Sequence, residues 1–298
     1  MHADEVDVDV RLVRSLLAAQ FPEWSPLPVE PVLPRGTDNA LYRLGDELVA
    51  RLPRTPRTDT ALQSERTWLP RLAPHLPLAV PAPLADGEPG EGYPFRWAVY
   101  SWLEGENATS DRIADETGLA ADLAGLIAAL QRIDPAGGPE PGPWNVFRGE
   151  PISRRDEAVR SSIAKLGETV DGERVAQAWK RDSSAPDWDS RPVWLHGDLD
   201  SRNLLARDGR LSGVVDWGCV AVGDPACDVM VAWKMLSSEG RRLFRNALDV
   251  DDATWARARA WALSQALAAL SYYTLETNAS LVREAERWLV EVLGDAGV

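Results

Sequence analysis

Hydrophobic and polar positions divide the chain into a strand-like first part and a longer helical second part. After a helical segment at about 8–20, the stretch VEPVLPRGTDNALYRLGDELVARLPR has the pattern of three short strands separated by two turns. Apolar residues at helical spacing then predict a helix over 57–74. A loop and a strand that ends at Gly105 complete this first part.

The second part begins with an amphipathic helix from about residue 118 and a Pro/Gly-rich loop over 135–151. One segment differs from its helical surroundings, because NLLA and LSGVVDW are short apolar runs around a RDGR turn, which predicts a hairpin. Further helices are expected at 154–166, 171–181, 225–237, 238–248, 251–274 and 279–293. We therefore predict an α+β chain with a sheet-rich lobe at 1–104 and a helical lobe at 105–298.

Composition excludes several classes of protein. The net charge of -14 argues against nucleic-acid binding, because phosphate contacts need a basic face. The uncharged run 261–275 is shorter than the roughly 18–20 residues of a membrane span, so a buried helix fits it better. The N-terminus lacks a signal-peptide pattern, and the two cysteines lack metal-ligand spacing. We expect a soluble cytoplasmic monomer with reduced thiols and no membrane partner.

Polar residues at both outer ends of the predicted hairpin are candidates for chemistry. Asp198 precedes the first strand, Asn203 opens it and Asp216 closes the second. Because paired strands lie about 5 Å apart, Asn203 and Asp216 can converge on one cation. Their oxygen atoms suit Mg²⁺, and Asp198 would remain beside the metal as a base.

The spacing of these residues is more specific than their composition. His196, Gly197 and Asp198 are followed after four residues by Asn203 and later by the sequence DWG, which matches the order and spacing of a protein-kinase catalytic loop and its metal-binding motif. On HGDLDSRNLL, LSGVVDWG and VGDPACDVMVAW, the chain resembles the aminoglycoside phosphotransferases and related small-molecule kinases. The resemblance extends faintly through the first part of the chain.

The resemblance implies a bilobal, protein-kinase-like fold with the nucleotide between the lobes. It implies that Asp198 is the catalytic base and that Asn203 and Asp216 bind Mg²⁺. His196 is interpreted as a structural residue of the loop. Asp224, which precedes a proline, is interpreted as a helix cap, and Asp228 as a possible anchor of the catalytic loop.

The chain departs from the kinase pattern in its phosphate-binding cation. No lysine precedes Lys165, and the position expected for the strand lysine is Arg51. Glu65 lies on the apolar face of the following helix, so it is either a carboxylate that faces inward to meet a cation or a partly exposed edge residue. Arg51 is either the phosphate-binding cation, paired with Glu65, or a surface strand residue.

Other nucleotide and acceptor contacts carry weaker signals. The turn with Gly36, Thr37 and Asp38 is either a phosphate-covering loop or an ordinary hairpin turn. In the strand that resembles the family's hinge, the Ser101 carbonyl and the Leu103 amide would face the nucleobase, and this does not distinguish ATP from GTP. Tryptophan-rich helices either line an apolar acceptor pocket or form core. The side chains considered as acceptor contacts are Asp200, Arg202 and those of the stretch 144–148, which includes Trp144 and Asn145.

The predicted function is transfer of the γ-phosphoryl group of ATP or GTP to a hydroxyl of a small molecule, with Mg²⁺ as cofactor. An aminoglycoside, which is cationic, is the first acceptor considered. Alternatives are a macrolide, an amino sugar or another metabolite alcohol. Two other classes remain open: a non-catalytic nucleotide-binding relative, and a metal-dependent hydrolase, although the chain lacks the paired ligands that hydrolase sites usually show.

Overall fold

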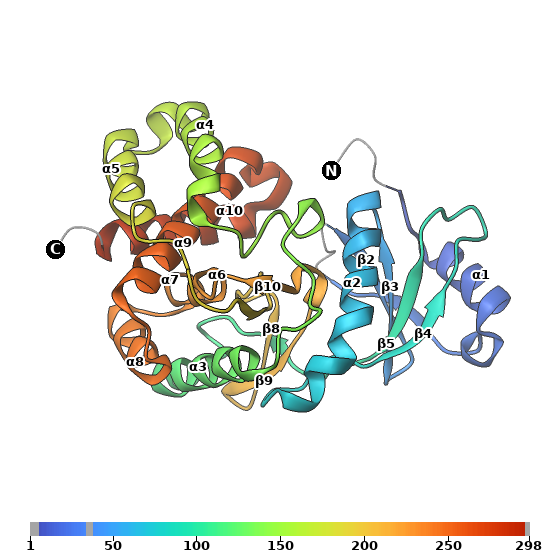
Figure 1. Ribbon diagram of the computed structural model, residues 1–298. Coiled ribbons are helices and arrows are strands. Elements are labelled where there is room, and N and C mark those ends of the chain that lie inside the picture. Colours follow the sequence, from blue (N-terminus) through green and yellow to red (C-terminus); the bar gives the residue numbers. More distant parts are fainter. Residues whose placement is uncertain (1–5, 34–37, 296–298) are drawn as a thin grey trace.

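The computed structural model describes residues 6–33 and 38–295, which form a sheet-containing lobe and a larger helical lobe (Figure 1). The sheet pairs antiparallel throughout in the order β1-β2-β3-β5-β4. The predicted two-lobed α+β fold is therefore confirmed. The elements of the first lobe are β1 (Val29–Pro31), β2 (Asn39–Leu44), β3 (Leu48–Pro53), β4 (Pro83–Gly87), β5 (Trp97–Ser101), α1 (Val10–Gln20) and α2 (Pro56–Leu72).

Helix α2 connects the two lobes. It begins at a capping box in which the side chains of Thr55 and Thr58 exchange hydrogen bonds with each other's backbone amides. Leu62 packs on the sheet beside Ala98 and Tyr100, whereas Leu69 and Leu72 belong to the core of the helical lobe. Figure 1 accordingly shows α2 between the sheet and the second lobe, while α1 covers the far face of the sheet.

Two features of the first lobe differ from the prediction. Strand β4 lies in a segment that the sequence pattern predicts as loop, because prolines interrupt its alternation. Strand β5 ends at Ser101 and not at Gly105, since the Trp102 amide turns to donate to the Glu47 carbonyl at 2.6 Å. The division between lobes near residue 104 stays an interpretation.

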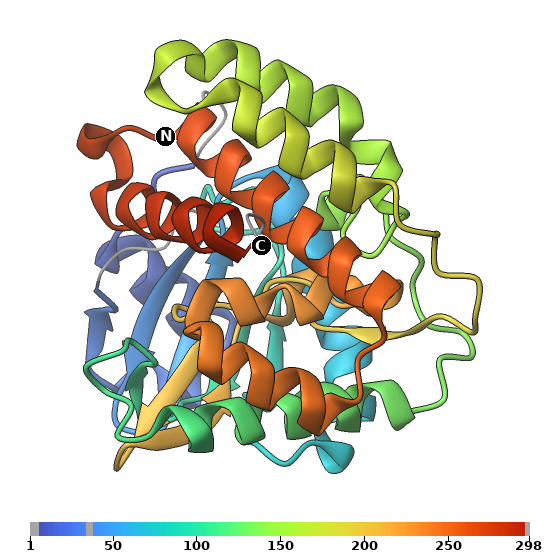
Figure 2. The ribbon, with the colours of Figure 1, turned by 90° about the vertical axis from the view of Figure 1, so that its left-hand side faces the viewer.

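Helix α9 is the central element of the second lobe. It packs against α4, α5, α6 and α10, and Figure 2 shows α4 and α5 on one side of it. Trp233, Trp261 and Trp288 are buried in the same core, which favours the core interpretation of the tryptophan-rich helices. None of the helices in the described ranges has the length and hydropathy to cross a membrane. The helices are α3 (Glu116–Arg132), α4 (Asp156–Leu166), α5 (Gly172–Ser183), α6 (Ala226–Val229), α7 (Val231–Met235), α8 (Ser238–Leu248), α9 (Asp252–Tyr272) and α10 (Leu275–Asp295).

The predicted hairpin is formed by β8 (Leu204–Arg207) and β9 (Arg210–Val214). Asp208 and Gly209 both have positive φ, 52° and 79°, as a two-residue type I′ turn requires. Three very short strands near this hairpin were not predicted from the sequence. These are β6 (Glu106–Asn107), which pairs with β8, and β7 (Val193–Leu195), which pairs with β10 (Ala221–Gly223).

A buried ion pair fixes α6 against α9. Asp224 accepts from the Ala226 amide at 3.0 Å, which supports its interpretation as a helix cap. The same carboxylate also accepts two bonds from Arg257, at 2.7 and 3.2 Å, and both side chains are almost completely buried. The Arg257 guanidinium also donates to the Pro186 carbonyl at 2.7 Å and to the Thr254 hydroxyl at 3.1 Å.

We expect Asp224→Ala to lower the free energy of unfolding by about 3–5 kcal/mol, because it leaves the Arg257 guanidinium buried without its counterion. Chemical denaturation would measure the loss. Asp187→Ala, which removes an exposed carboxylate, is the matched control and should change little. Equal stability of the two variants would contradict the assigned role of the pair.

Candidate active site

The candidate catalytic loop, between β7 and β8, is anchored by one buried carboxylate. Asp228 accepts from the backbone amides of His196 and Gly197, each at 2.8 Å, and is completely buried. Gly197 has a φ of +84°, and a Cβ there would approach the Cys219 carbonyl oxygen to 2.7 Å, so only glycine fits. The expected anchoring role of Asp228 is thus seen directly in the hydrogen bonds.

His196 links the loop that carries Asp198 to the segment that precedes Asp216. Its Nδ1 accepts from the Asp198 amide at 3.1 Å, and its Nε2 lies 3.1 Å from the Val215 carbonyl oxygen. An amide donor on Nδ1 and a carbonyl acceptor at Nε2 are satisfied together only by the neutral Nε2–H tautomer. The ring also packs edge-on against Trp217. These contacts favour the structural interpretation of His196.

Asn203 and Asp216 lie together at the open end of the hairpin. The Val215 amide donates to the Asn203 carbonyl at 2.9 Å, which places Asp216 beside Asn203. The Asn203 side-chain amide donates to the Asp198 carbonyl at 2.8 Å, which fixes the orientation of its Oδ1. Within the described ranges Oδ1 has no hydrogen-bond partner. One carboxylate and one oriented amide oxygen are the hard donor set that Mg²⁺ requires, so the residues fit this ion.

The Asp198 carboxylate is partly exposed and is surrounded by cations. Its Oδ1 lies 2.5 Å from Nη1 of Arg148. Burial alone would raise the pKa of Asp198, but Arg148, Lys234 and Arg202 outweigh burial and hold the pKa well below its ordinary value. Asp198 therefore remains ionised at neutral pH and can orient and receive a hydroxyl proton.

Arg51 is a buried member of the site and not a surface residue. Its Nη1 donates to Glu65 Oε2 at 2.5 Å, and its Nη2 donates to Asp216. Glu65 is only 1% exposed, so the interpretation as an inward-facing carboxylate is the one supported. The guanidinium thus bridges α2 and the segment after β9.

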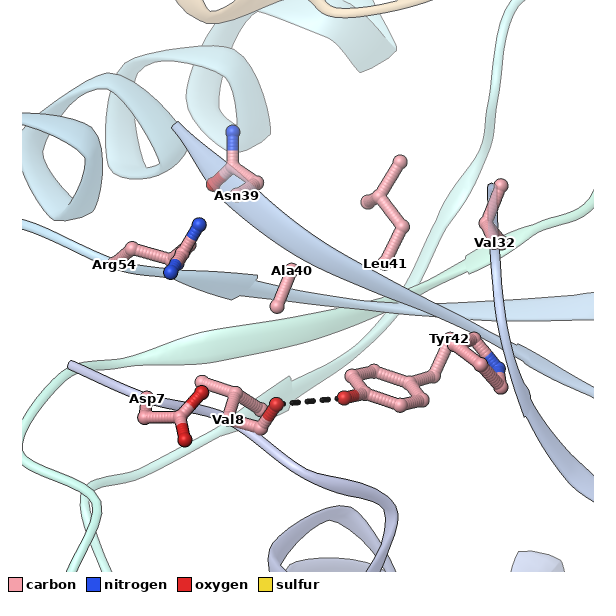
Figure 3. A pocket seen from close by; sticks show the side chains of 9 residues that line it. Asp7, Val8, Val32, Asn39, Ala40, Leu41, Tyr42 and Arg54 are labelled. Atoms are coloured by element: carbon pink, nitrogen blue, oxygen red, sulfur yellow. Dashed lines mark hydrogen bonds between the residues drawn. The ribbon is translucent and has the colours of Figure 1, made fainter. Parts of the chain in front are cut away.

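Asn39 completes the surroundings of Arg51. With its amide oxygen toward the guanidinium, Asn39 accepts from Nε and Nη2 of Arg51 at 3.2 and 3.1 Å. Figure 3 shows the small cavity at this end of β2, where Tyr42 reaches the Val8 carbonyl on one side of the strand while Asn39 points to the other side. Alternation along β2 therefore directs Asn39 to the face that carries Arg51.

The remaining nucleotide candidates lie in the first lobe and in the segment that follows β5, or outside the described ranges. Gly36 and Thr37 are among the residues that the structure does not describe. Asp38 pairs with Arg57 at the start of α2 at 2.8 Å. Ser101 pairs with Leu48 of β3 at the end of the sheet, and the Leu103 amide has no partner among the described residues, as a nucleobase contact would require.

The four acceptor candidates differ in accessibility. Asp200 is completely buried and accepts from Arg202, whose own side chain is partly exposed. Trp144 is half-buried. Asn145 is completely buried and bonds to the Gly142 amide and the Arg148 carbonyl, each at 2.9 Å. The structure therefore brings Arg202 and Trp144 to accessible positions, and gives Asp200 and Asn145 supporting contacts.

Several residues around the candidate catalytic carboxylates make contacts that the sequence does not predict. Arg148 and Lys234 lie near Asp198, and Glu284 accepts from the Ser201 hydroxyl of the catalytic loop at 2.9 Å. Lys234 carried one signal, because it is one of three lysines and lies in an otherwise apolar helical run. No local pattern distinguishes Arg148 from the other arginines.

Comparison with known proteins agrees with this geometry. The family model described as the phosphotransferase enzyme family matches residues 31–261. The chain belongs to this family. A curated relative, the uncharacterized protein YcbJ of Bacillus subtilis (strain 168), is 26% identical over 159 residues, which cover 53% of this chain and 49% of the relative. The match thus spans about half the length of that relative.

Solved structures of phosphotransferases share the fold of this family member. The GDP and kanamycin complex of APH(2")-IIIa has a TM-score of 0.73 at 18% identity, over 95% of this chain and 98% of that one. Macrolide 2'-phosphotransferase MphH from Brachybacterium faecium has a TM-score of 0.61 at 22% identity, over 95% and 97%. At these identities the likeness establishes the fold alone.

Asp228→Asn tests the support of the catalytic loop. The asparagine amide keeps one acceptor oxygen but presents an NH₂ group to a backbone N–H donor. We therefore expect the free energy of unfolding to fall by about 1–3 kcal/mol. Denaturant titration measures this loss. Asp249→Asn, at an exposed helix end where asparagine tolerates the left-handed backbone, should leave stability unchanged. If both variants behave alike, Asp228 is not an anchor.

Proposed function

We propose that this protein transfers the γ-phosphoryl group of ATP or GTP to a hydroxyl group of a small molecule. The observation that carries the proposal is the convergence of Asp198, Asn203 and Asp216 at one end of the β8–β9 hairpin, beside the buried Arg51. Membership of the phosphotransferase enzyme family supports it. Among proteins of the same fold, solved complexes contain GDP, ADP or ATP.

Each residue has a separate task in this proposal. Asp198 accepts a hydrogen bond from the acceptor hydroxyl and aims its oxygen at the γ-phosphorus. As the new P–O bond forms, the bond to the β-phosphate oxygen breaks, the nucleoside diphosphate leaves, and the hydroxyl proton passes to Asp198. Because the pKa of Asp198 is held low, its main contribution is orientation, and proton acceptance is late.

Asn203 and Asp216 would hold Mg²⁺, and Arg51 would contribute positive charge beside the phosphates. The bound ion would neutralise the phosphate oxygens and orient the leaving group. In the structure Arg51 donates to Asp216, so this guanidinium already balances the carboxylate that the metal would use. Arginine is permanently charged and binds phosphate with a fork of two donors.

The acceptor is proposed as a small hydroxylated molecule, with aminoglycosides as the first class to test. A neighbour of the same fold was solved with kanamycin. A less highly charged acceptor such as a macrolide is the second class, and a specific observation favours it. The acids next to Asp198, namely Asp200 and Glu284, are balanced by Arg202 and Lys234, so they do not form an open anionic surface for a polycation.

The decisive experiment measures nucleotide consumption with a panel of kanamycin, gentamicin, erythromycin and simple amino sugars. We expect at least one hydroxylated compound to be phosphorylated by the wild type and Asp198→Asn to lose about 10²–10⁴-fold in kcat with unchanged nucleotide affinity. Nucleotide binding without transfer to any compound would instead support a non-catalytic relative. Hydrolysis of phosphate esters without nucleotide would support a metal-dependent hydrolase.

Asp216→Asn tests the metal site separately. Loss of the carboxylate charge should raise the Mg²⁺ concentration for half-maximal nucleotide binding at least about 10-fold. Calorimetric titration of Mg²⁺ at fixed nucleotide measures this change without any acceptor. Asp208→Asn, at the exposed turn of the same hairpin, serves as the charge-matched control. An unchanged Mg²⁺ requirement in Asp216→Asn would remove Asp216 from the ligand set.

A further inference from the structure

The Asp198 carboxylate contacts Arg148, a residue of the second lobe that lies outside the kinase-like sequence motifs. Nη1 of Arg148 lies 2.5 Å from Asp198 Oδ1 and donates to the Gly197 carbonyl at 3.0 Å. The same nitrogen approaches the sulfur of Cys219 at 3.7 Å. Arg148 therefore touches the catalytic loop and the segment after Asp216 at once.

The backbone on both sides of Arg148 is fixed. The buried side chain of Asn145 donates to the Arg148 carbonyl at 2.9 Å and closes the preceding turn onto Gly142. After Arg148, the Gly149 carbonyl accepts from the Asp224 amide at 2.9 Å. Gly149 has a φ of +99°, and a Cβ there would meet Leu195 of β7 at 2.6 Å. The guanidinium is thus presented to Asp198 from a rigid segment.

Two strained residues accompany this rigidity. Val146 and Phe147 both have a φ of 57°, a conformation that is costly for a β-branched and for an aromatic residue, and both are partly exposed. Strain of this kind persists where surrounding contacts determine the backbone, and it is common at functional sites. Here the two residues with positive φ directly precede Arg148, whose guanidinium contacts the candidate catalytic loop.

We propose that Arg148 is a positioning residue for Asp198: it occupies Oδ1 and so directs Oδ2 toward the acceptor hydroxyl. The proposal rests on the proposed phosphotransferase function. Asp198 has two carboxylate oxygens, and within the described ranges Oδ2 has no hydrogen-bond partner. A carboxylate pinned at one oxygen cannot rotate freely, so the other oxygen keeps one direction.

Charge balance alone does not account for Arg148. Lys234 and Arg202 already place positive charge near Asp198 through the Asp200 network, and both lower its pKa. Only Arg148 among the described residues makes direct contact with the Asp198 carboxylate. Arg148 also lies in the segment between α3 and α4, close in sequence to the acceptor candidate Trp144. An acceptor that contacts this segment would therefore also affect how Arg148 orients the Asp198 carboxylate.

The test compares Arg148→Ala, Arg148→Lys and the control Arg154→Ala in the full-length protein with Mg·ATP and Mg·GTP. Arg154 lies in the same part of the chain but is exposed, and its one ion-pair partner among the described residues is Glu150. The measurements are nucleotide affinity, kcat and KM with the kanamycin and erythromycin panel, and slow hydrolysis of nucleotide by water. Addition of guanidinium ion to Arg148→Ala provides chemical rescue, which a merely structural role would not show.

We expect Arg148→Ala to lose about 10²-fold in kcat with unchanged nucleotide affinity, because misplacement of a reacting group by about 1 Å costs that much. Arg148→Lys should recover part of the rate, guanidinium ion should restore part of it to Arg148→Ala, and Arg154→Ala should match the wild type. If Arg148→Ala does not fold, Arg148→Met takes its place: methionine fills similar space but cannot donate to Asp198 Oδ1, so a wild-type kcat in Arg148→Met overturns the positioning role.

A wild-type kcat in folded Arg148→Ala, or a loss that guanidinium ion does not relieve, would overturn the proposal while the phosphotransferase function stands. A wild type that transfers phosphate to neither the panel nor water would overturn the proposed function itself, and the role of Arg148 with it. These two failures are distinguishable because the first requires an active wild type.

Discussion

The burial of one guanidinium, that of Arg51, constrains the whole candidate site. A charge removed from water must be paired and hydrogen-bonded, and Arg51 meets this condition only when Glu65 of α2 and Asp216 after β9 are both in place. Strand β3, helix α2 and the hairpin of the second lobe are therefore brought to one point. Because α2 also packs into the second-lobe core through Leu69 and Leu72, the two lobes meet along apolar as well as ionic contacts.

In the candidate catalytic loop, too, each buried carboxylate has hydrogen-bond or ion-pair partners. Asp228 lies beneath the loop, where it forms no salt bridge with a described residue but accepts from two backbone amides. Above it, the anions Asp198 and Asp200 alternate with Arg148 and Arg202. Because these charged side chains are already held in place, they would need to move little during phosphoryl transfer. Preorganisation of this kind lowers the activation free energy of a reaction.

The parts of this site that the sequence predicts are those encoded within about twenty residues. The hairpin and the spacing of Asp198, Asn203 and Asp216 follow from local strand and turn patterns, and the inward direction of Glu65 follows from helical periodicity. Strands β7 and β10 were missed because they are three residues long and pair only through tertiary contact. The contact of Arg148 with Asp198 could not be predicted, because Arg148 lies 50 positions before Asp198 and nothing in its neighbourhood marks the arginine that the fold selects.

The two-residue turn of the β8–β9 hairpin has a consequence for how the chain can vary. Side chains alternate between faces along a strand, so one added residue in either strand would turn the end of that strand over. Asn203 and Asp216 must stay on the same side, and the single irregularity in the ladder, beside Ser212, already absorbs one unpaired position. Asn203 and Asp216 are 13 positions apart. Related chains with a longer or shorter hairpin should therefore differ by an even number of residues between these two positions, or carry a compensating bulge.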